Sequence, residues 1–157
     1  AWNAGEKEQI QIRRRFMLLG QTLAGMQTWD IRRALQAIRA PANPSTQAGA
    51  KIDVHAGAAM SVPALYATLF EAPPASLTLF DPPSTHADGP DLLNVLRFID
   101  IPQAAAMVAE RGIDINLMAI NIQSRAADRW RYPAAVIERL KWPNAAITFG
   151  AKHPPRR

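Results

Sequence analysis

The residues best suited to chemistry follow a short apolar strand that turns sharply into a helix. The strand, 52–56, is followed by the small residues Gly57, Ala58 and Ala59, and a helix is expected over 62–71. A tight strand-to-helix turn can present a serine hydroxyl as a nucleophile, in the pattern G-x-S-x-G. Here Gly57 and Ala58 stand where the hydroxyl would be. The sequence therefore predicts the scaffold for nucleophilic catalysis without its nucleophile.

The hydroxyl nearest to this turn belongs to Ser61. It lies beyond the turn, at the start of the expected helix, so we favour a helix-capping role for it over that of a nucleophile. The histidine of the strand, His55, points to one face of that strand. A single strand histidine is more often a packed or partly wet side chain than a general base, and we expect that here. A nucleophile relocated to Ser61 is the alternative.

A second group of polar residues follows the strand expected over 76–80. Ser84, His86 and Asp88 carry the three side-chain types of a catalytic triad. A triad needs the hydroxyl, imidazole and carboxylate in hydrogen-bonding succession, and residues two apart in sequence rarely face each other in that geometry. We therefore favour turn and capping roles, with Asp88 or Gly89 starting a helix. A nucleophile at Ser84 is the alternative.

Other kinds of site have little support in the sequence. Cysteine is absent, which excludes disulfides and thiolate chemistry, and no histidine spacing matches a metal-binding motif. Neither a Walker A loop nor a G-x-G-x-x-G turn occurs. We therefore expect neither a metal ion nor a cofactor.

Apolar strands alternate with helices along the chain. Short apolar strands joined by helices favour parallel pairing through right-handed crossovers, and a parallel sheet is expected to be covered on both faces. The sequence thus predicts an α/β fold with three layers and a mostly parallel sheet of about four strands. Strands are expected over 52–56, 76–80, 113–120 and 145–149, and helices over 28–40, 62–71, 92–99, 101–111 and 126–140.

The whole chain, 1–157, is expected to form a single domain, with loose ends at 1–12 and 151–157. Residues 16–151 contain 11 basic and 11 acidic side chains, so the net charge of +5 arises entirely outside them. A nucleic-acid-binding protein would carry its basic residues on a folded face, and no apolar run approaches the ~20 residues that span a bilayer. Neither nucleic acid nor a membrane is therefore expected as a partner. Because the chain begins at Ala1 rather than Met, we expect a processed product or a fragment of a longer reading frame.

Two segments resemble one known family. Residues 14–35, with Leu18-Leu19-Gly20, Gly25-Met26 and Trp29-Asp30, are similar to the segment that precedes the nucleophile in bacterial acetyl xylan esterase-like α/β-hydrolases. Residues 55–70 resemble the helix that follows the nucleophile in that family. The resemblance implies a partial α/β-hydrolase fold that corresponds to its C-terminal half.

The resemblance also implies candidate catalytic residues. It places a catalytic histidine after the fourth strand, where His153 lies, and a catalytic acid in the loop after the third strand, where Asp128 is the acidic residue. The serine of the G-x-S-x-G pattern has no counterpart at Gly57 or Ala58. The strands that precede the nucleophile in the family, with their oxyanion loop, are also absent from this chain. The largest catalytic contributions are therefore missing.

We therefore expect a fragment or degenerate domain of a carboxylic ester hydrolase that is inactive by itself. The resemblance implies a carbohydrate ester as the ligand and a secreted or periplasmic location. The expected partner is the remainder of a larger hydrolase chain or another α/β-hydrolase domain, because one edge of the first strand has no evident neighbour. A non-catalytic interaction or carbohydrate-associated module, and an ester hydrolase with a relocated serine, are the alternatives.

Overall fold

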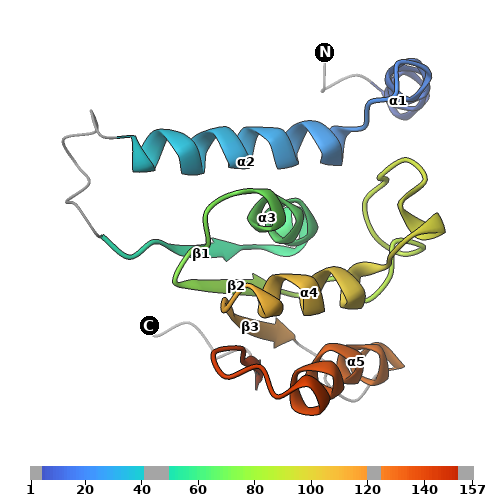
Figure 1. Cartoon of the computed structure of the whole chain (residues 1–157). Helices are drawn as coiled ribbons and strands as arrows, with labels where there is room; N and C mark the ends of the chain where they lie inside the picture. The colour runs from blue at the N-terminus through green and yellow to red at the C-terminus, as the bar shows by residue number, and fades with distance from the viewer. Residues whose placement is uncertain (1–4, 41–49, 120–124, 152–157) are drawn as a thin grey trace, which may run out of the picture.

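The computed structural model of the chain describes residues 5–40, 50–119 and 125–151. Two helices precede the first strand, and strands and helices alternate from there onward (Figure 1). None of the described helices combines the length and the apolar character needed to cross a bilayer. The elements are α1 (Glu6–Leu18), α2 (Leu23–Arg39), β1 (Asp53–Ala56), α3 (Ala58–Phe70), β2 (Ser76–Phe80), the 3-10 helix η1 (Val95–Arg97), α4 (Ile101–Glu110), β3 (Asp114–Ala119), α5 (Arg125–Leu140) and β4 (Ile147–Ala151).

The four strands form one sheet in the order β1-β2-β3-β4, and each neighbouring pair is parallel. Val54 is level with Leu77, Leu77 with Ile115, and Ile115 with Ile147, so one apolar row crosses the whole sheet. The expected α/β class and the expected parallel sheet of four strands are confirmed. Each strand also begins and ends within two residues of its expected position, although β4 includes Ala151, which was expected to be loose.

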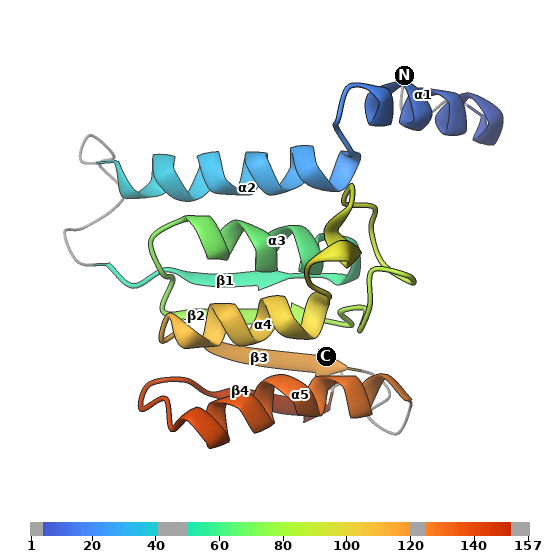
Figure 2. The ribbon, with the colours of Figure 1, turned by 45° about the vertical axis from the view of Figure 1, so that its right-hand side comes forward.

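The helices that join the strands lie on one face of this sheet. Strands that follow one another in spatial order, joined by right-handed crossovers, place every connecting helix on the same side. Accordingly α3, α4 and α5 pack side by side, and α2 packs against α3 beyond the β1 edge (Figures 1 and 2). The described residues thus supply a sheet and one helical layer. The third layer that the sequence predicts for this chain is not formed by the described residues.

Polar side chains occupy the face of the sheet that turns away from these helices. The central row consists of His55, Thr78, Asn116 and Thr148, one from each strand. The Thr148 hydroxyl donates a hydrogen bond to Asn116 Oδ1 at 2.6 Å, and Asn116 Nδ2 lies 3.5 Å from Thr78 Oγ1. His55 and Thr148 are exposed. In the middle of the strands, apolar residues toward the helices therefore alternate with polar residues on the other face, of which Thr78 is buried.

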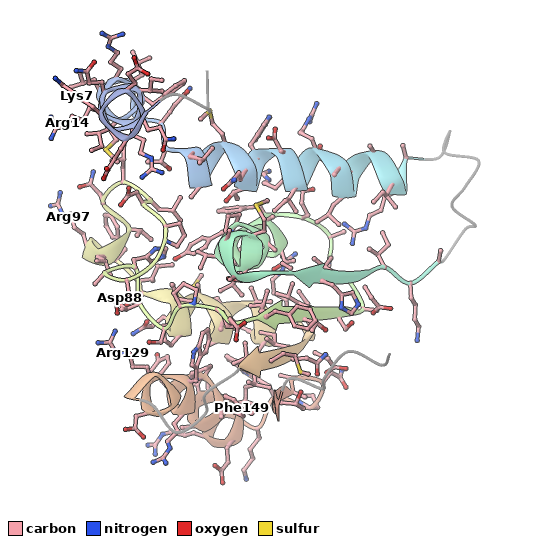
Figure 3. All side chains as sticks on the ribbon, turned by 180° about the vertical axis from the view of Figure 1, so that it is seen from behind. Lys7, Arg14, Asp88, Arg97, Arg129 and Phe149 are labelled. Atoms are coloured by element: carbon pink, nitrogen blue, oxygen red, sulfur yellow. The ribbon has the colours of Figure 1, made fainter. Side chains whose placement is uncertain are left out.

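The first helix begins earlier than the sequence indicated. α1 begins at Glu6, so the expectation of a loose segment over 1–12 is wrong from that residue onward. Acidic residues lie in the first turn of α1 and Arg15 lies in its last turn, which suits the helix dipole. Lys7 and Arg14 lie on the outer side of α1 (Figure 3). Much of the positive charge expected on a loose end is therefore carried by a helix.

The second helix also begins earlier, at Leu23 rather than at Thr28. Its N-cap is Thr22, whose hydroxyl oxygen accepts a hydrogen bond from the Gly25 N–H at 3.0 Å. A threonine in this position satisfies one of the unpaired N–H groups of the first turn. The apolar periodicity that predicts the helix becomes clear only beyond this first turn. The predicted start, Thr28, therefore lies too far along the chain.

The segment between β2 and α4 is irregular, although a helix was expected over 92–99. Only η1 forms there, after Asn94 adopts a positive φ of 59°. The helix start expected at Asp88 or Gly89 is wrong as well, because the Asp88 N–H closes a turn on the Thr85 carbonyl at 3.2 Å. A residue with left-handed backbone angles interrupts a helix. The apolar spacing over 92–99 therefore predicted a longer helix than the one that forms.

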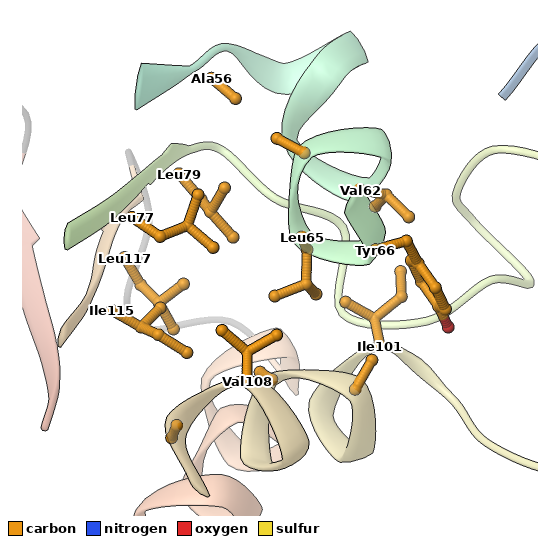
Figure 4. Close-up of a cluster of buried hydrophobic side chains, with 14 of the residues drawn as sticks. Ala56, Val62, Leu65, Tyr66, Leu77, Leu79, Ile101, Val108, Ile115 and Leu117 are labelled. Atoms are coloured by element: carbon orange, nitrogen blue, oxygen red, sulfur yellow. The ribbon is translucent and has the colours of Figure 1, made fainter. Parts of the chain in front are cut away.

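The core lies between the sheet and the helices, where side chains of β2 and β3 point toward those of α3 and α4 (Figure 4). α3 is buried on nearly all sides, because the sheet, α2 and α4 surround it. This burial holds the turn before α3 in place. Fully buried side chains of the core include Leu65, Leu77, Leu79, Ile101, Val108, Ile115 and Leu117.

Candidate functional site

The turn after β1 is tight, and its backbone is relaxed. β1 ends at Ala56, Gly57 is the N-cap of α3, and the helix begins at Ala58. The expected strand, turn and helix are confirmed, although α3 begins four residues before the expected start at Val62. Gly57 has φ −75° and ψ 174°, and no residue of this turn has a positive φ. A turn that presents a serine nucleophile is strained, whereas this one displays a hydrogen and methyl groups without that strain.

A cavity of about 550 Å³ opens beside this turn. One wall is the start of α3, a second is the loop after β2, and a third comes from α1 and α2. Ligands of open parallel sheets bind outside the carboxyl ends of the strands, which is where these walls meet. The wall residues are Ala58 and Ala59; Asp81, Pro83 and 88–91; Arg13, Phe16 and Met17; and Thr22, Leu23, Ala24, Met26 and Gln27.

The cavity is mostly apolar, with a few charged groups. Arg13, Asp88 and Asp91 are exposed, and Figure 3 shows Asp88 on the side of the molecule that carries α1. The hydroxyl among the described wall residues is that of Thr22, which already caps α2. No serine, cysteine, histidine or tyrosine belongs to these walls. The cavity can hold a ligand, but its described walls provide no nucleophile and no histidine base.

Ser61 lies within the first turns of α3, where it is completely buried. Its hydroxyl donates a hydrogen bond to the Ala58 carbonyl at 2.8 Å. The expected helix-capping role of Ser61 is wrong, because Gly57 occupies the N-cap position. The early start of α3 moves Ser61 from the cap into the helix. Ser61 is also not among the cavity walls, so it does not meet a ligand there.

His86 is buried, and both of its ring nitrogens have hydrogen-bond partners. Nδ1 lies 3.1 Å from the Pro90 carbonyl oxygen, and Nε2 lies 2.9 Å from the Tyr66 hydroxyl oxygen. Because a carbonyl only accepts, we assign the proton to Nδ1, and Nε2 then accepts from Tyr66. No ring nitrogen is left as a base for Ser84. The structure therefore agrees with the turn role favoured for this segment over a Ser84–His86–Asp88 triad.

Asp100 ties the loop of His86 to α4. Its carboxylate accepts hydrogen bonds from the Thr85 hydroxyl at 2.6 Å, the His86 N–H at 2.7 Å and the Ile101 N–H at 2.8 Å. Burial disfavours the charged form, but these hydrogen bonds outweigh it and lower the pKa of Asp100. Burial, and then the negative charge of Asp100, raise the pKa of Tyr66 to about 12. This polar cluster stabilises the loop that forms one wall of the cavity.

Of the acid and the base that the resemblance implied, the structure describes only the acid, Asp128. Asp128 lies in the first turn of α5, is exposed, and pairs with Arg131 at 3.5 Å. A surface pair of this kind contributes little to stability. His153 lies outside the described residues. Its pairing with Asp128 therefore stays a prediction.

The sequence pattern did not predict that α1 and α2 form part of the cavity wall. Arg13 and Phe16 of α1 and Gln27 of α2 form walls, although no element was expected before residue 28. The available signal was the spacing of Ile12 and Phe16, four residues apart as on one face of a helix. Because the neighbouring arginines make this segment mostly charged, the spacing of Ile12 and Phe16 did not indicate a helix.

A metal centre has no support in the described part of the chain, where no group of three or more histidine or acidic residues is arranged to hold an ion. No family model, curated protein or solved structure matches the chain.

Proposed function

We propose that the chain is an α/β-hydrolase-like domain of acetyl xylan esterase-like lineage that binds a ligand without hydrolysing it by itself. The observation that carries this proposal is the turn after β1, which meets the cavity through Ala58 and Ala59 and holds no nucleophile. The order of elements after this turn, with three further parallel strands each preceded by a helix, supports the lineage.

Ester hydrolysis by a serine enzyme requires a hydroxyl nucleophile, a base and donors for the oxyanion. α3 begins at Ala58 without a side-chain cap, and the Met60 N–H donates to the Gly57 carbonyl at 2.9 Å, so the N–H groups of the exposed Ala58 and Ala59 are the ones that could meet an oxygen atom of a ligand. These donors favour binding of a polar group. Cleavage does not follow, because the described walls lack the attacking hydroxyl and its base.

The ligand suggested by the resemblance is a carbohydrate ester, and the composition of the cavity supports this choice. Arg13, Gln27, Asp88 and Asp91 offer donors and acceptors for sugar hydroxyl groups, and Phe16 adds an aromatic surface. The volume of about 550 Å³ lies within the range of roughly 300–1,000 Å³ typical of small-molecule sites.

Hydrolysis of an aryl acetate by the purified chain tests the absence of catalysis. We expect the same rate as in buffer, and no change in the Ser61→Ala or Ser84→Ala variants. Turnover that is lost in His153→Ala, or in either serine variant, would overturn the proposal.

Calorimetry with an acetylated xylo-oligosaccharide tests the binding half of the proposal. Ala58→Trp places a bulky side chain in the cavity, and we expect it to abolish binding. Ala135→Trp, on the exposed surface of α5, is the matched control and should bind like the unaltered chain. Equal binding by both variants would show that the ligand does not use this cavity.

A role as an interaction module is the second candidate function, and the outer edge of β1 favours it. The partner would be the remainder of a larger hydrolase chain or another α/β-hydrolase domain. In this case the chain completes a larger sheet rather than acting alone.

A further inference from the structure

We propose that the outer edge of β1 is an acceptor site for a single extended peptide segment, which pairs with it as a fifth strand. This inference rests on the second candidate function, which uses the same edge, and narrows the partner to one extended segment. It requires neither a ligand in the cavity nor a hydrolase lineage. Three features carry it: the backbone groups that β1 turns outward, the position of α2, and the polar side chains of the open face.

Every second residue of β1 directs its backbone N–H and C=O away from β2. The Ile52 carbonyl accepts a hydrogen bond from the Ala75 N–H at 2.8 Å, so Ile52 and the residues that alternate with it face β2. Asp53 and His55 therefore direct their backbone groups to the outer edge. No other described strand pairs with that edge. An unpaired strand edge is a template for main-chain hydrogen bonding to another segment.

The position of α2 determines what can occupy this edge. α2 lies beyond β1, on the side away from β2, and it packs against α3 (Figures 1 and 2). Leu23 and Gln27 line the cavity beside Ala58, so this flank of α2 is turned toward the end of β1. Leu23, Gln27, Asp30 and Ala34 share this flank, and Leu23, Asp30 and Ala34 are exposed. The flank is therefore part apolar and part polar, and it leaves room for a narrow extended strand beside β1.

A second copy of this chain does not suit the site. Two β1 edges that pair in antiparallel fashion are related by an axis perpendicular to the sheet, which places both helical layers on the same face. The two α2 helices would then compete for the space over the joint, because each lies beyond its own β1 (Figure 2). A single extended segment without a helix on that face avoids this conflict.

The chemistry of β1 indicates what the segment carries. Lys51, Asp53 and His55 are exposed and follow one another on the open face. A segment with alternating apolar and charged residues would place the apolar ones on the helical side of the sheet and the charged ones beside Lys51 and Asp53. Opposite charges on neighbouring strands stabilise the pairing. We therefore expect a segment that carries both acidic and basic side chains on its polar face.

The test uses the full chain and a capped, fluorescein-labelled heptapeptide in which valine alternates with glutamate, lysine and threonine. We expect saturable binding in a fluorescence anisotropy titration. His55→Pro should weaken it about tenfold or more, because proline removes the outward N–H of residue 55 and leaves the hydrogen bonds to β2 intact.

Phe149→Pro is the matched control on the opposite edge of the sheet. The Ala146 carbonyl accepts a hydrogen bond from the Ile115 N–H at 2.9 Å, so the Phe149 N–H also points outward, from β4. Figure 3 shows Phe149 on the side of the sheet remote from α2. We expect this variant to bind the peptide like the unaltered chain, and circular dichroism compares the folding of both variants.

A second measurement keeps the inference testable if His55→Pro fails to fold. The peptide is N-methylated at the residues that would donate to β1 and is titrated with the unaltered chain, to which it should not bind. The proposal is overturned if the unmodified peptide does not bind, if a folded His55→Pro variant binds with unchanged affinity, or if N-methylation leaves the affinity unchanged.

Discussion

Glu71 joins three helices through its side chain and its backbone carbonyl. Its carboxylate accepts hydrogen bonds from Arg32 Nε at 2.7 Å and from Gln36 Nε2 at 2.9 Å, both on α2. Arg111, which follows α4, donates to the Glu71 carbonyl at 2.7 Å. The hydrogen bond from Arg32, and then that from Gln36, lower the pKa of Glu71. An acid with a lowered pKa stabilises the fold above its unfolded-state value, and this contribution is lost as the pH falls through the folded-state value.

We therefore predict that Glu71→Gln removes part of the acid sensitivity of the fold. The unaltered chain should lose more unfolding free energy than the variant as the pH falls from neutrality to below about 4.5. Urea unfolding at a series of pH values measures this difference. Glu138→Gln, on an exposed part of α5, should keep the acid sensitivity of the unaltered chain. Parallel pH profiles for the unaltered chain and Glu71→Gln would contradict the prediction.

Tyr66 provides a prediction at alkaline pH. Its pKa is raised from 10.0 to about 12, so the neutral form is favoured in the folded state. This stabilisation is fully present below pH 10 and is lost as the pH rises toward 12. An ultraviolet titration in a Tyr132→Phe background should show Tyr66 ionising well above pH 10. An ionisation midpoint near 10 in folded protein would contradict this prediction.

At the scale of single residues, the sequence gives the residue types but not the contact partners that determine their roles. Ser61 and His86 were reasonable candidates, yet one is buried inside a helix and the other is hydrogen-bonded at both nitrogens. Their burial depends on contacts between α3 and the loop after β2, which are distant in sequence. Glu71 carried no local signal, because its partners lie on α2, 35 and 39 residues away.

Asp100 shows how one residue can define an element. It forms a capping box with Gln103 at the start of α4, directly before Ile101 and Pro102. It also holds Thr85 and His86 of the loop that lines the cavity. The end of the loop and the start of the helix are therefore stabilised by the same carboxylate.

We predict that Asp100→Ala lowers the unfolding free energy by about 2–3 kcal/mol, because the helix loses its cap and buried donors lose their acceptor. Denaturant unfolding measures this change. Asp114→Ala, at the exposed start of β3, should change the unfolding free energy by less than about 0.5 kcal/mol. Equal effects of the two substitutions would contradict the role assigned to Asp100.

Among the elements, the strands were more predictable than the first helices. Alternating residues such as Leu77, Thr78 and Leu79 mark strands that turn one apolar face to the helices, and the bounds of these strands follow from the flanking turns. α1 is rich in charged residues and has no fully buried side chain, so periodicity gave little indication of it. The segment 92–99 has helical spacing, but Asn94 in the left-handed region interrupts it.

At the scale of the whole molecule, the cavity and the open sheet face depend on the spatial arrangement of distant segments. Arg13, Ala58 and Asp88 become neighbours of one cavity only because α1 and the beginning of α2 lie near the carboxyl end of β1 (Figure 2). The polar row from His55 to Thr148 requires the strand order and the register together. A sequence reveals the alternation within each strand, but the shared surface appears only when the strands are aligned.

We infer that the cavity beside the strand-to-helix turn holds no activated nucleophile. The most direct measurement is reaction of the native chain with a fluorophosphonate, which modifies activated serines, followed by mass spectrometry of its peptides. We predict no adduct at Ser61, Ser84 or any other serine beyond the level found in the unfolded chain. A serine adduct that forms only in the folded chain, and disappears in His153→Ala, would contradict the claim.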